Sequence, residues 1–317
     1  MWWKILLFIW IAVFSAFGII TPVAGTFGDL AMYAQMSPEK EIPLKITLDA
    51  KSAEPDDAGA FVLKATDVHG LVSPVAFAAK PADLDAASSY LVLARYDAAA
   101  HRVAVSRILA TDPGLTFPFI PGLEERAKII FFHVPMSWLT VIAFLVSMWF
   151  GIKYLRRKQM DDDAKSAISA GLGLLFCILA TTTGSVWAKF NWGSFWNWDP
   201  RETSIFVLLL VYGAYFALRS AIEVEEKRAS LSAVYSILAA VTVPFFIFIM
   251  PRIMPGLHPG SADDTTSGPV VSSGGMDATM RVVLYGLLLG YIVLYAWLMR
   301  IRFRLYRISL ARTTDHA

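Results

Sequence analysis

Cysteine is nearly absent from this sequence. The only one in 317 residues, Cys177, lies inside an apolar run. A single cysteine excludes an intrachain disulfide, a CxxC redox pair, a thiolate zinc site and a CxxCH covalent haem attachment. Any metal must therefore be held by histidine or oxygen ligands.

Charged residues are also scarce. They make up only 17% of the chain, whereas 56% is hydrophobic and the mean hydropathy is +0.54. Soluble domains carry about 25% charged residues, so the composition indicates a membrane protein and excludes disordered and fibrous classes. The net charge of +2 is too close to balance to indicate a nucleic-acid-binding surface.

The sequence instead contains several long apolar stretches. A hydrocarbon core about 30 Å thick requires roughly 20 apolar residues in a helix. Stretches that approach this length are residues 4–22, 129–152, 166–187, 203–221, 231–250 and 281–299. The predicted fold class is an all-α polytopic membrane bundle of about six transmembrane helices, with a small β-rich exported insert.

The basic residues of the short connections lie mostly on one side of this bundle. They follow the second, fourth and sixth stretches: Lys153, Arg156, Arg157, Lys158, Lys165, Arg219, Lys227, Arg228, Arg300, Arg302, Arg304, Arg307 and Arg312. The positive-inside rule therefore predicts that both termini are cytoplasmic. The acidic run Asp161, Asp162 and Asp163 is interpreted as a solvated cytoplasmic turn.

The first stretch allows two readings. Lys4, the apolar run and the small residues of 21–25 would suit a cleaved signal peptide as well as a transmembrane helix. Under either reading residues 23–127 are exported, and the later stretches keep their orientation.

The exported insert differs in composition from the rest of the chain. Short alternating segments at 43–48, 60–65 and 90–95 are separated by Gly, Pro and Asp. This period of two predicts a β-rich domain, for which a compact barrel of the OB type is the favoured form. His69 and His101 stand beside turn-like residues and are interpreted as solvated surface groups.

The predicted organisation has four parts. A first transmembrane helix or anchor covers 1–22, and the insert covers 23–127. A five-helix membrane domain covers 128–305 and contains a tryptophan-rich outer loop at 187–203, and 306–317 is a cytoplasmic tail.

Tryptophan is concentrated in the loop 187–203. Of the 10 tryptophans in the chain it contains Trp187, Trp192, Trp196 and Trp198. Tryptophans gather at membrane interfaces, so an interfacial belt is one interpretation. The interleaved Gly193 and the following Asp199 favour the other, a flat apolar platform that stacks on a large planar ligand.

The end of this loop has the pattern of a helix start. Asp199 can cap a helix whose first residue is Pro200, with Glu202 in the first turn. Arg201 could pair locally with these carboxylates or bind a carboxylate on a ligand, and the residues leave both open.

Two histidines stand at the outer ends of predicted spans. His133 opens the second stretch and His258 follows the fifth, so both face the compartment of the tryptophan loop. One histidine at an interface is usually a hydrogen-bonding group. Two of them beside aromatic rings indicate an axial pair for a haem iron.

The segment 192–199, with these histidines, resembles a known family. WGSFWNWD is similar to the WGxxWxWD signature of the haem-handling membrane proteins of cytochrome c maturation. His133 before Val134 and Pro135, and His258 after Leu257, are similar to the histidines that flank this signature. The topology most resembles the CcmC type, and the resemblance covers about residues 125–305.

The resemblance implies a non-enzymatic haem-binding protein of the bacterial inner membrane. The tryptophan loop would hold non-covalent haem b on the periplasmic face, with His133 and His258 as bis-histidine ligands. The protein would pass haem to a haem chaperone on the way to apocytochrome c, alongside other membrane subunits of a maturation complex.

Individual site residues acquire roles from the same resemblance. Gly193 would let the backbone approach the ring, Asp199 would order the loop and Arg201 would meet a propionate. The residues that would pack the porphyrin are Trp187, Trp192, Trp196 and Trp198.

Two features depart from the CcmC pattern. The tail 199–203 is closer to the WDPKE motif of the CcsA family, the haem-delivering component of the other cytochrome c assembly system, which has more spans and histidines. The insert 23–127 is longer than the first outer loop of CcmC.

Other membrane functions are less favoured. A b-type cytochrome that moves electrons across the bilayer needs a second haem at the inner face, and none of the five histidines lies near the inner end of a span. A single-haem redox protein remains an alternative. A transporter would need acids or bases at mid-membrane, which the spans lack.

Overall fold

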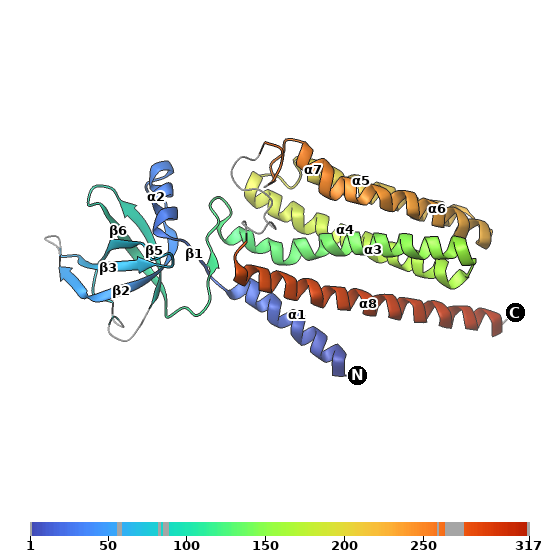
Figure 1. The fold of residues 1–317 in the computed structure, drawn as a ribbon, viewed down its shortest axis with the longest axis horizontal. Helices are drawn as coiled ribbons and strands as arrows, with labels where there is room; N and C mark the ends of the chain where they lie inside the picture. The colour runs from blue at the N-terminus through green and yellow to red at the C-terminus, as the bar shows by residue number, and fades with distance from the viewer. Residues whose placement is uncertain are drawn as a thin grey trace. The chain divides into compact units, whose positions relative to one another are not determined.

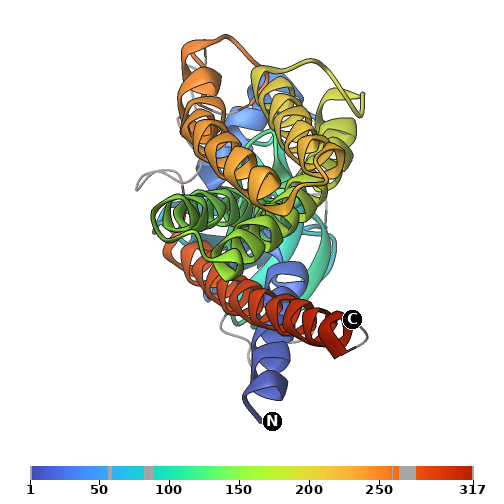
Figure 2. The same ribbon diagram turned by 90° about the vertical axis from the view of Figure 1, so that its right-hand side faces the viewer.

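The computed structural model describes residues 2–55, 59–81, 84, 89–258, 260–263 and 276–315. They belong to two compact units. The chain up to residue 19 and from residue 128 onward forms one, here called the membrane unit, and residues 20–127 form the other, the barrel unit. Helices of the membrane unit run side by side in Figure 1, and Figure 2 looks along them.

Helices account for the predicted spans. Their bounds are α1 (Trp2–Ile20), η1 (Glu124–Ile129), α3 (Ile130–Arg157), α4 (Met160–Trp192), α5 (Pro200–Ala221), α6 (Glu225–Pro244), η2 (Phe245–Ile249), α7 (Met250–Ile253) and α8 (Ala278–Asp315). Among the described residues, 6 helical segments are long and apolar enough to cross a membrane, and each overlaps one predicted stretch. The prediction of about six spans is confirmed.

Helices α3 and α4 occupy the centre of the membrane unit. α3 packs against α4, α6 and α8, and α4 also packs against α5 (Figure 2). Phe144 of α3 stacks on Tyr212 of α5 with ring centroids 3.4 Å apart. A Cβ on Gly173 of α4 would lie 2.5 Å from the Phe144 ring, so the glycine permits this close approach.

A glycine notch on α8 receives α1. A Cβ on Gly286 would lie 2.2 Å from the Phe14 ring, and one on Gly290 would lie 2.8 Å from Ile11. Trp10 donates its indole N–H to the carbonyl of Gly286 at 2.8 Å. Small residues at both positions therefore let bulky side chains of α1 reach the backbone of α8.

The acidic run at the start of α4 is not the solvated turn that its composition predicts. Asp162 and Asp163 are only 2% and 4% exposed. Arg219 of α5 donates to both carboxylate oxygens of Asp163 at 2.7 and 2.9 Å, and Lys153 lies 3.4 Å from Asp162. The carboxylates occupy the first helical turn, where backbone N–H groups favour negative charge, and neighbouring helices supply the cations.

The barrel unit is built on a closed five-stranded barrel. Its strands are β2 (Ile42–Pro55), β3 (Phe61–Asp67), β4 (Val72–Phe77), β5 (Tyr90–Asp97) and β6 (Arg102–Thr111), in the order β2-β3-β4-β6-β5. Among the described strands of the barrel, the β4–β6 pair is parallel and the other pairs are antiparallel. The alternating segments predicted as strands fall on β2, β3 and β5, which confirms a β-rich insert, while its classification as an OB fold stays a prediction.

Short elements complete the barrel unit. They are β1 (Val23–Ala24), α2 (Phe27–Met36) and β7 (Phe117–Pro118), and β1 pairs with β7. The buried Asp67 accepts the backbone N–H of Phe27 at 2.9 Å, which ties the start of α2 to the end of β3. His69 and His101 are exposed in turns, as predicted.

Candidate functional site

The connection between α4 and α5 is shorter than the loop predicted at 187–203. α4 continues to Trp192 and ends at Gly193, which adopts the left-handed conformation (φ 80°) that glycine tolerates best at a helix end. α5 begins at its N-cap, Asp199. A Cβ on Gly193 would meet nothing within 4 Å, so its clear structural role is to end α4.

The tryptophans divide into two groups as a result. Trp187 and Trp192 lie on the last turns of α4, with ring centroids 4.9 Å apart and planes at 80°. Trp196 and Trp198 lie in the connection, 5.8 Å apart and at 90°, and both contact the ring of Phe206. The rings meet edge to face, so the single flat platform predicted from composition is wrong.

In the second group Trp198 is exposed and has an unusual backbone conformation, whereas Trp196 is partly buried. Trp198 has a φ of 56°, which is rare for a bulky residue, and 68% of its surface is exposed. Phe190 and Phe195 are 70% and 58% exposed. The C-terminal end of α4 and the following connection thus carry several exposed aromatic side chains.

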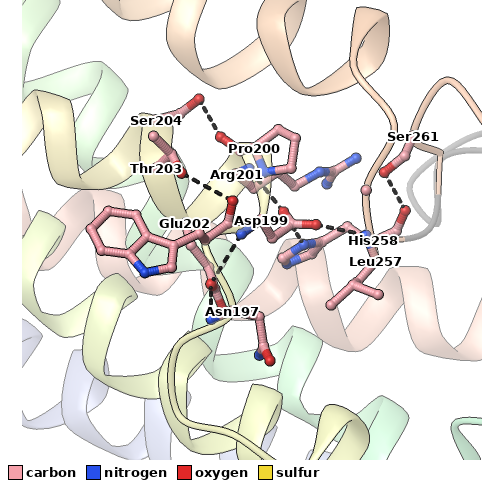
Figure 3. A network of polar contacts seen from close by, with 12 residues as sticks. Asn197, Asp199, Pro200, Arg201, Glu202, Thr203, Ser204, Leu257, His258 and Ser261 are labelled. Carbon is pink, nitrogen blue, oxygen red and sulfur yellow. Dashed lines mark hydrogen bonds and ion pairs between the residues drawn. The ribbon is translucent and has the colours of Figure 1, made fainter.

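Asp199 is the centre of the polar network in this region (Figure 3). One carboxylate oxygen accepts the backbone N–H of Arg201 at 2.9 Å, and the other accepts that of Leu257 at 2.7 Å. Glu202 completes the capping box by accepting the N–H of Asp199 at 3.3 Å and that of Asn197 at 2.6 Å. The predicted helix start is confirmed.

His258 is held by the same carboxylate. Its Nδ1 lies 2.7 Å from Oδ1 of Asp199, and its side chain is 17% exposed. The rings of Trp192 and Trp187 lie 4.7 and 5.7 Å from the imidazole, centroid to centroid. The first tryptophan group and the histidine therefore form one cluster.

Burial and hydrogen bonding shift the pKa of Asp199 in opposite directions. Burial would raise the pKa of this carboxyl, but the hydrogen bond and charge of His258 lower it, as do the N–H groups of Arg201 and Leu257. Together they bring the pKa to about 2. Asp199 is therefore a carboxylate, an acceptor only, and the His258 Nδ1 next to it must carry the hydrogen.

The chain reaches His258 through an irregular end of the fifth span. The π-helix η2 follows Pro244, and the short α7 ends at Ile253. Ser261 then bonds to the carbonyl of His258 through its N–H at 3.2 Å and its hydroxyl at 2.7 Å. π-Helical turns are rare and are frequent at functional sites.

His133 lies in the first turns of α3 and faces α4. Its Nδ1 is 3.0 Å from the carbonyl oxygen of Ala180 and 3.2 Å from the hydroxyl of Thr183. A carbonyl only accepts, so this Nδ1 also carries its hydrogen. His258 and Arg201 are close enough to His133 to interact with it electrostatically.

Both imidazoles therefore share one tautomer. With hydrogen on Nδ1, the lone pair of each ring is on Nε2, and no described residue forms a hydrogen bond to either Nε2. Arg201 adds positive charge, and it interacts electrostatically with Asp199 and Arg252. The arrangement places two imidazole Nε2 atoms beside aromatic rings and the guanidinium of Arg201.

Several buried polar atoms of this region, Oε1 of Glu202 among them, have no hydrogen-bond partner among the described residues. The indole nitrogen of Trp187 and Oδ1 of Asn191 are buried without a hydrogen bond from any described residue. Native proteins satisfy nearly all such atoms. A donor and an acceptor therefore remain available next to the histidine cluster.

Sequence reasoning missed the partners that orient the histidines. It did not single out Thr183 or Ala180, and the contribution of Ala180 is a backbone carbonyl. It placed Asp199 at a helix start but not against His258. A carboxylate-histidine pair has no sequence signal when, as here, 59 positions separate the partners.

The chain is similar to proteins of one known family. A family model described as CcmC, Heme exporter protein C, matches residues 79–316, which include every site residue named above. Heme exporter protein C of Paracoccus denitrificans is 30% identical over 198 residues, 61% of this chain and 80% of that protein. Its counterpart in Escherichia coli K12 is 29% identical over 199 residues, 59% and 74% of the two chains. A putative cytochrome c biosynthesis ccmC-like mitochondrial protein of Marchantia polymorpha is 27% identical over 124 residues, 39% and 52%.

Proposed function

Because this chain belongs to the heme exporter protein C (CcmC) family, we propose that it binds haem at the outer face of the membrane and presents it to a haem chaperone or apocytochrome. The chain is a multi-pass inner-membrane protein of cytochrome c biogenesis. Haem is its cargo, and no reaction is assigned to it. The WDPRE tail that resembles CcsA does not change the family.

The shared tautomer of the two histidines carries this proposal. Histidines that bind metal usually donate their other ring N–H to a carboxylate or a backbone carbonyl, which orients the ring. Asp199 serves His258 in this way, and the Ala180 carbonyl serves His133. The two Nε2 atoms would hold a haem iron, whose other nitrogen ligands come from the porphyrin.

The surroundings of the histidines also suit haem. Trp187 and Trp192 pack on His258, and Trp196 and Trp198 offer a second aromatic group. Arg201 and the unpartnered Trp187 N–H are donors for propionate oxygens. The haem would be non-covalent and b-type, because Cys177 is buried and outside any CxxCH motif.

Orientation and partners follow from the same proposal. The basic ends of α3, α5 and α8 would lie in the cytoplasm with both termini, and His133 and His258 would face the periplasm. A haem chaperone and other membrane subunits of a maturation complex would receive the haem. The exposed rings of Phe190, Phe195 and Trp198 are available for such a contact.

Absorption and pyridine haemochrome spectra of the detergent-purified full chain test the proposal. We expect wild-type protein to carry low-spin b-type haem, and His133→Ala and His258→Ala each to lose haem or become high-spin. His69→Ala, in an exposed turn of the barrel unit, is the matched control and should leave the spectrum unchanged. Wild-type protein without haem, or haem that survives both ligand substitutions, would overturn the proposal.

A further inference from the structure

We infer that the turn of α4 at residues 180–184 is a positioning element for His133. It sets which ring nitrogen faces the haem site and how deeply the ring sits against α4. The inference rests on the proposed function, because it concerns a ligand of the same haem. These residues lie outside the WGSFWNWD segment, which covers 192–199.

The first part of the element is the acceptor pair at Nδ1. The Ala180 carbonyl is 3.0 Å away and the Thr183 hydroxyl 3.2 Å away. Thr183 has one hydroxyl hydrogen, and carbonyls of its own helix, Leu179 and Ala180, lie 2.8 and 3.1 Å from that oxygen. Since the hydrogen is directed to a carbonyl, the hydroxyl faces His133 as a second acceptor, and only the tautomer with hydrogen on Nδ1 fits.

The second part is the space at Gly184. A Cβ at this position would lie 3.0 Å from Cε1, 3.4 Å from Nδ1 and 3.9 Å from Nε2 of His133. Ordinary carbon–carbon contacts begin at about 3.5 Å. Any side chain at Gly184 would therefore push the imidazole away from α4.

The acceptor pair and the space at Gly184 both hold the His133 ring close to α4. Ala180, Thr183 and Gly184 all lie on α4, so a ring displaced from Gly184 must lengthen its bonds to the other two. Each fixes the ring against the same helix face. His133 can keep both its tautomer and its depth only while residue 184 has no side chain.

Other glycines of α4 supply matched controls. A Cβ on Gly171 would contact only Phe216 at 3.6 Å, an ordinary van der Waals distance. A Cβ on Gly173 would overlap the Phe144 ring at 2.5 Å, away from His133. The same Gly→Ala change can thus be harmless, disruptive to packing, or directed at the ligand.

The experiment compares these variants in the full-length protein. Wild type, Gly184→Ala, Gly184→Val, Gly171→Ala and Gly173→Ala would be purified haem-free and titrated with haem, with absorption and EPR spectra to report spin state. Thermal unfolding of the haem-free proteins would report fold. Free imidazole would then be added, because it can replace a displaced axial ligand.

We expect the effect to be specific to residue 184. Gly184→Ala should lower haem affinity about tenfold and produce a high-spin fraction, Gly184→Val should do more, and imidazole should restore the low-spin spectrum in both. Gly171→Ala should match wild type. Gly173→Ala should lower the unfolding temperature but keep the low-spin spectrum.

The outcomes separate the two proposals. A low-spin wild type with an identical Gly184→Ala spectrum and affinity would overturn the positioning role and leave the proposed function standing. Loss of haem by Gly184→Ala that tracks a lowered unfolding temperature and resists imidazole would also overturn it, since that pattern indicates a packing defect. Wild-type protein that binds no haem would overturn the proposed function itself.

Discussion

Asp199 and His258 are joined by a hydrogen bond of 2.7 Å across 59 positions of the chain. The same carboxylate caps α5 and accepts the backbone N–H of Leu257. One side chain therefore starts a helix, anchors the segment after α7 and orients an imidazole (Figure 3).

Asp199→Asn separates capping from orientation. Asparagine is as good an N-cap as aspartate, so α5 should remain intact. The amide cannot supply the negative charge that fixes and strengthens His258 as a ligand, and haem affinity should fall about 10- to 100-fold. Haem titration with circular dichroism would test this, and a normal affinity in a folded Asp199→Asn protein would contradict it.

The pKa of Asp199 predicts an acid-sensitive contribution to stability. The ordinary value of 3.8 is lowered to about 2 in the folded protein, despite burial, by His258 and two backbone N–H groups. Because the pKa of Asp199 is lower in the folded protein, its carboxylate stabilises the fold fully above pH 3.8. This stabilisation is lost as the pH falls toward 2. The difference in unfolding temperature between wild type and Asp199→Asn should shrink over this range. A difference that stays constant from pH 4 to pH 2 would contradict the assignment.

Gly286→Ala should weaken the packing of α1 on α8. The new Cβ would lie 2.2 Å from the Phe14 ring. Overpacking of this kind costs about 1–3 kcal/mol, and each kcal/mol lowers the unfolding temperature by roughly 2–4 °C in chains of about 150–250 residues. Gly213→Ala on α5 is the control, because a Cβ there meets nothing within 4 Å. Equal unfolding temperatures for the two variants would argue against the notch.

Arg219→Ala should be strongly destabilising. It leaves the buried Asp163 without its bidentate partner, which costs about 3–5 kcal/mol in comparable buried pairs. Arg307→Ala removes a contact to Asp161 whose two side chains are 59% and 37% exposed, and should cost less than about 1 kcal/mol. Thermal unfolding of both variants tests the contrast. The double variant Arg219→Met, Asp163→Leu should regain much of the lost stability, since it leaves no unpaired charge in the interior.

The membrane helices were predictable because their causes are local. In lipid every backbone polar group must be satisfied within its own segment, so an apolar stretch of sufficient length becomes a helix whatever it packs against. The strands of the barrel unit were likewise indicated by the alternation at 43–48, 60–65 and 90–95, which places one face of each strand inside. The cap at Asp199 also depends only on the next three residues.

Errors arose where one segment determines the surroundings of another. The acidic run at Asp162 and Asp163 has the composition of a solvated turn. It is buried because Arg219, on the distant helix α5, pairs with Asp163. The tryptophans are close in sequence, which predicts one platform. In the structure α4 ends at Gly193, and this separates them into two edge-to-face groups.

The sequence by itself determined the membrane class, the spans, the β-rich character of the insert and which residue types gather near the helix ends that carry His133 and His258, because hydropathy and periodicity act over neighbouring residues. Only the tertiary structure decided that Asp199 accepts from His258 and that the Ala180 carbonyl and Gly184 receive His133. A ring tautomer depends on the acceptor that packing brings to it, and that acceptor can be a backbone carbonyl of any residue type.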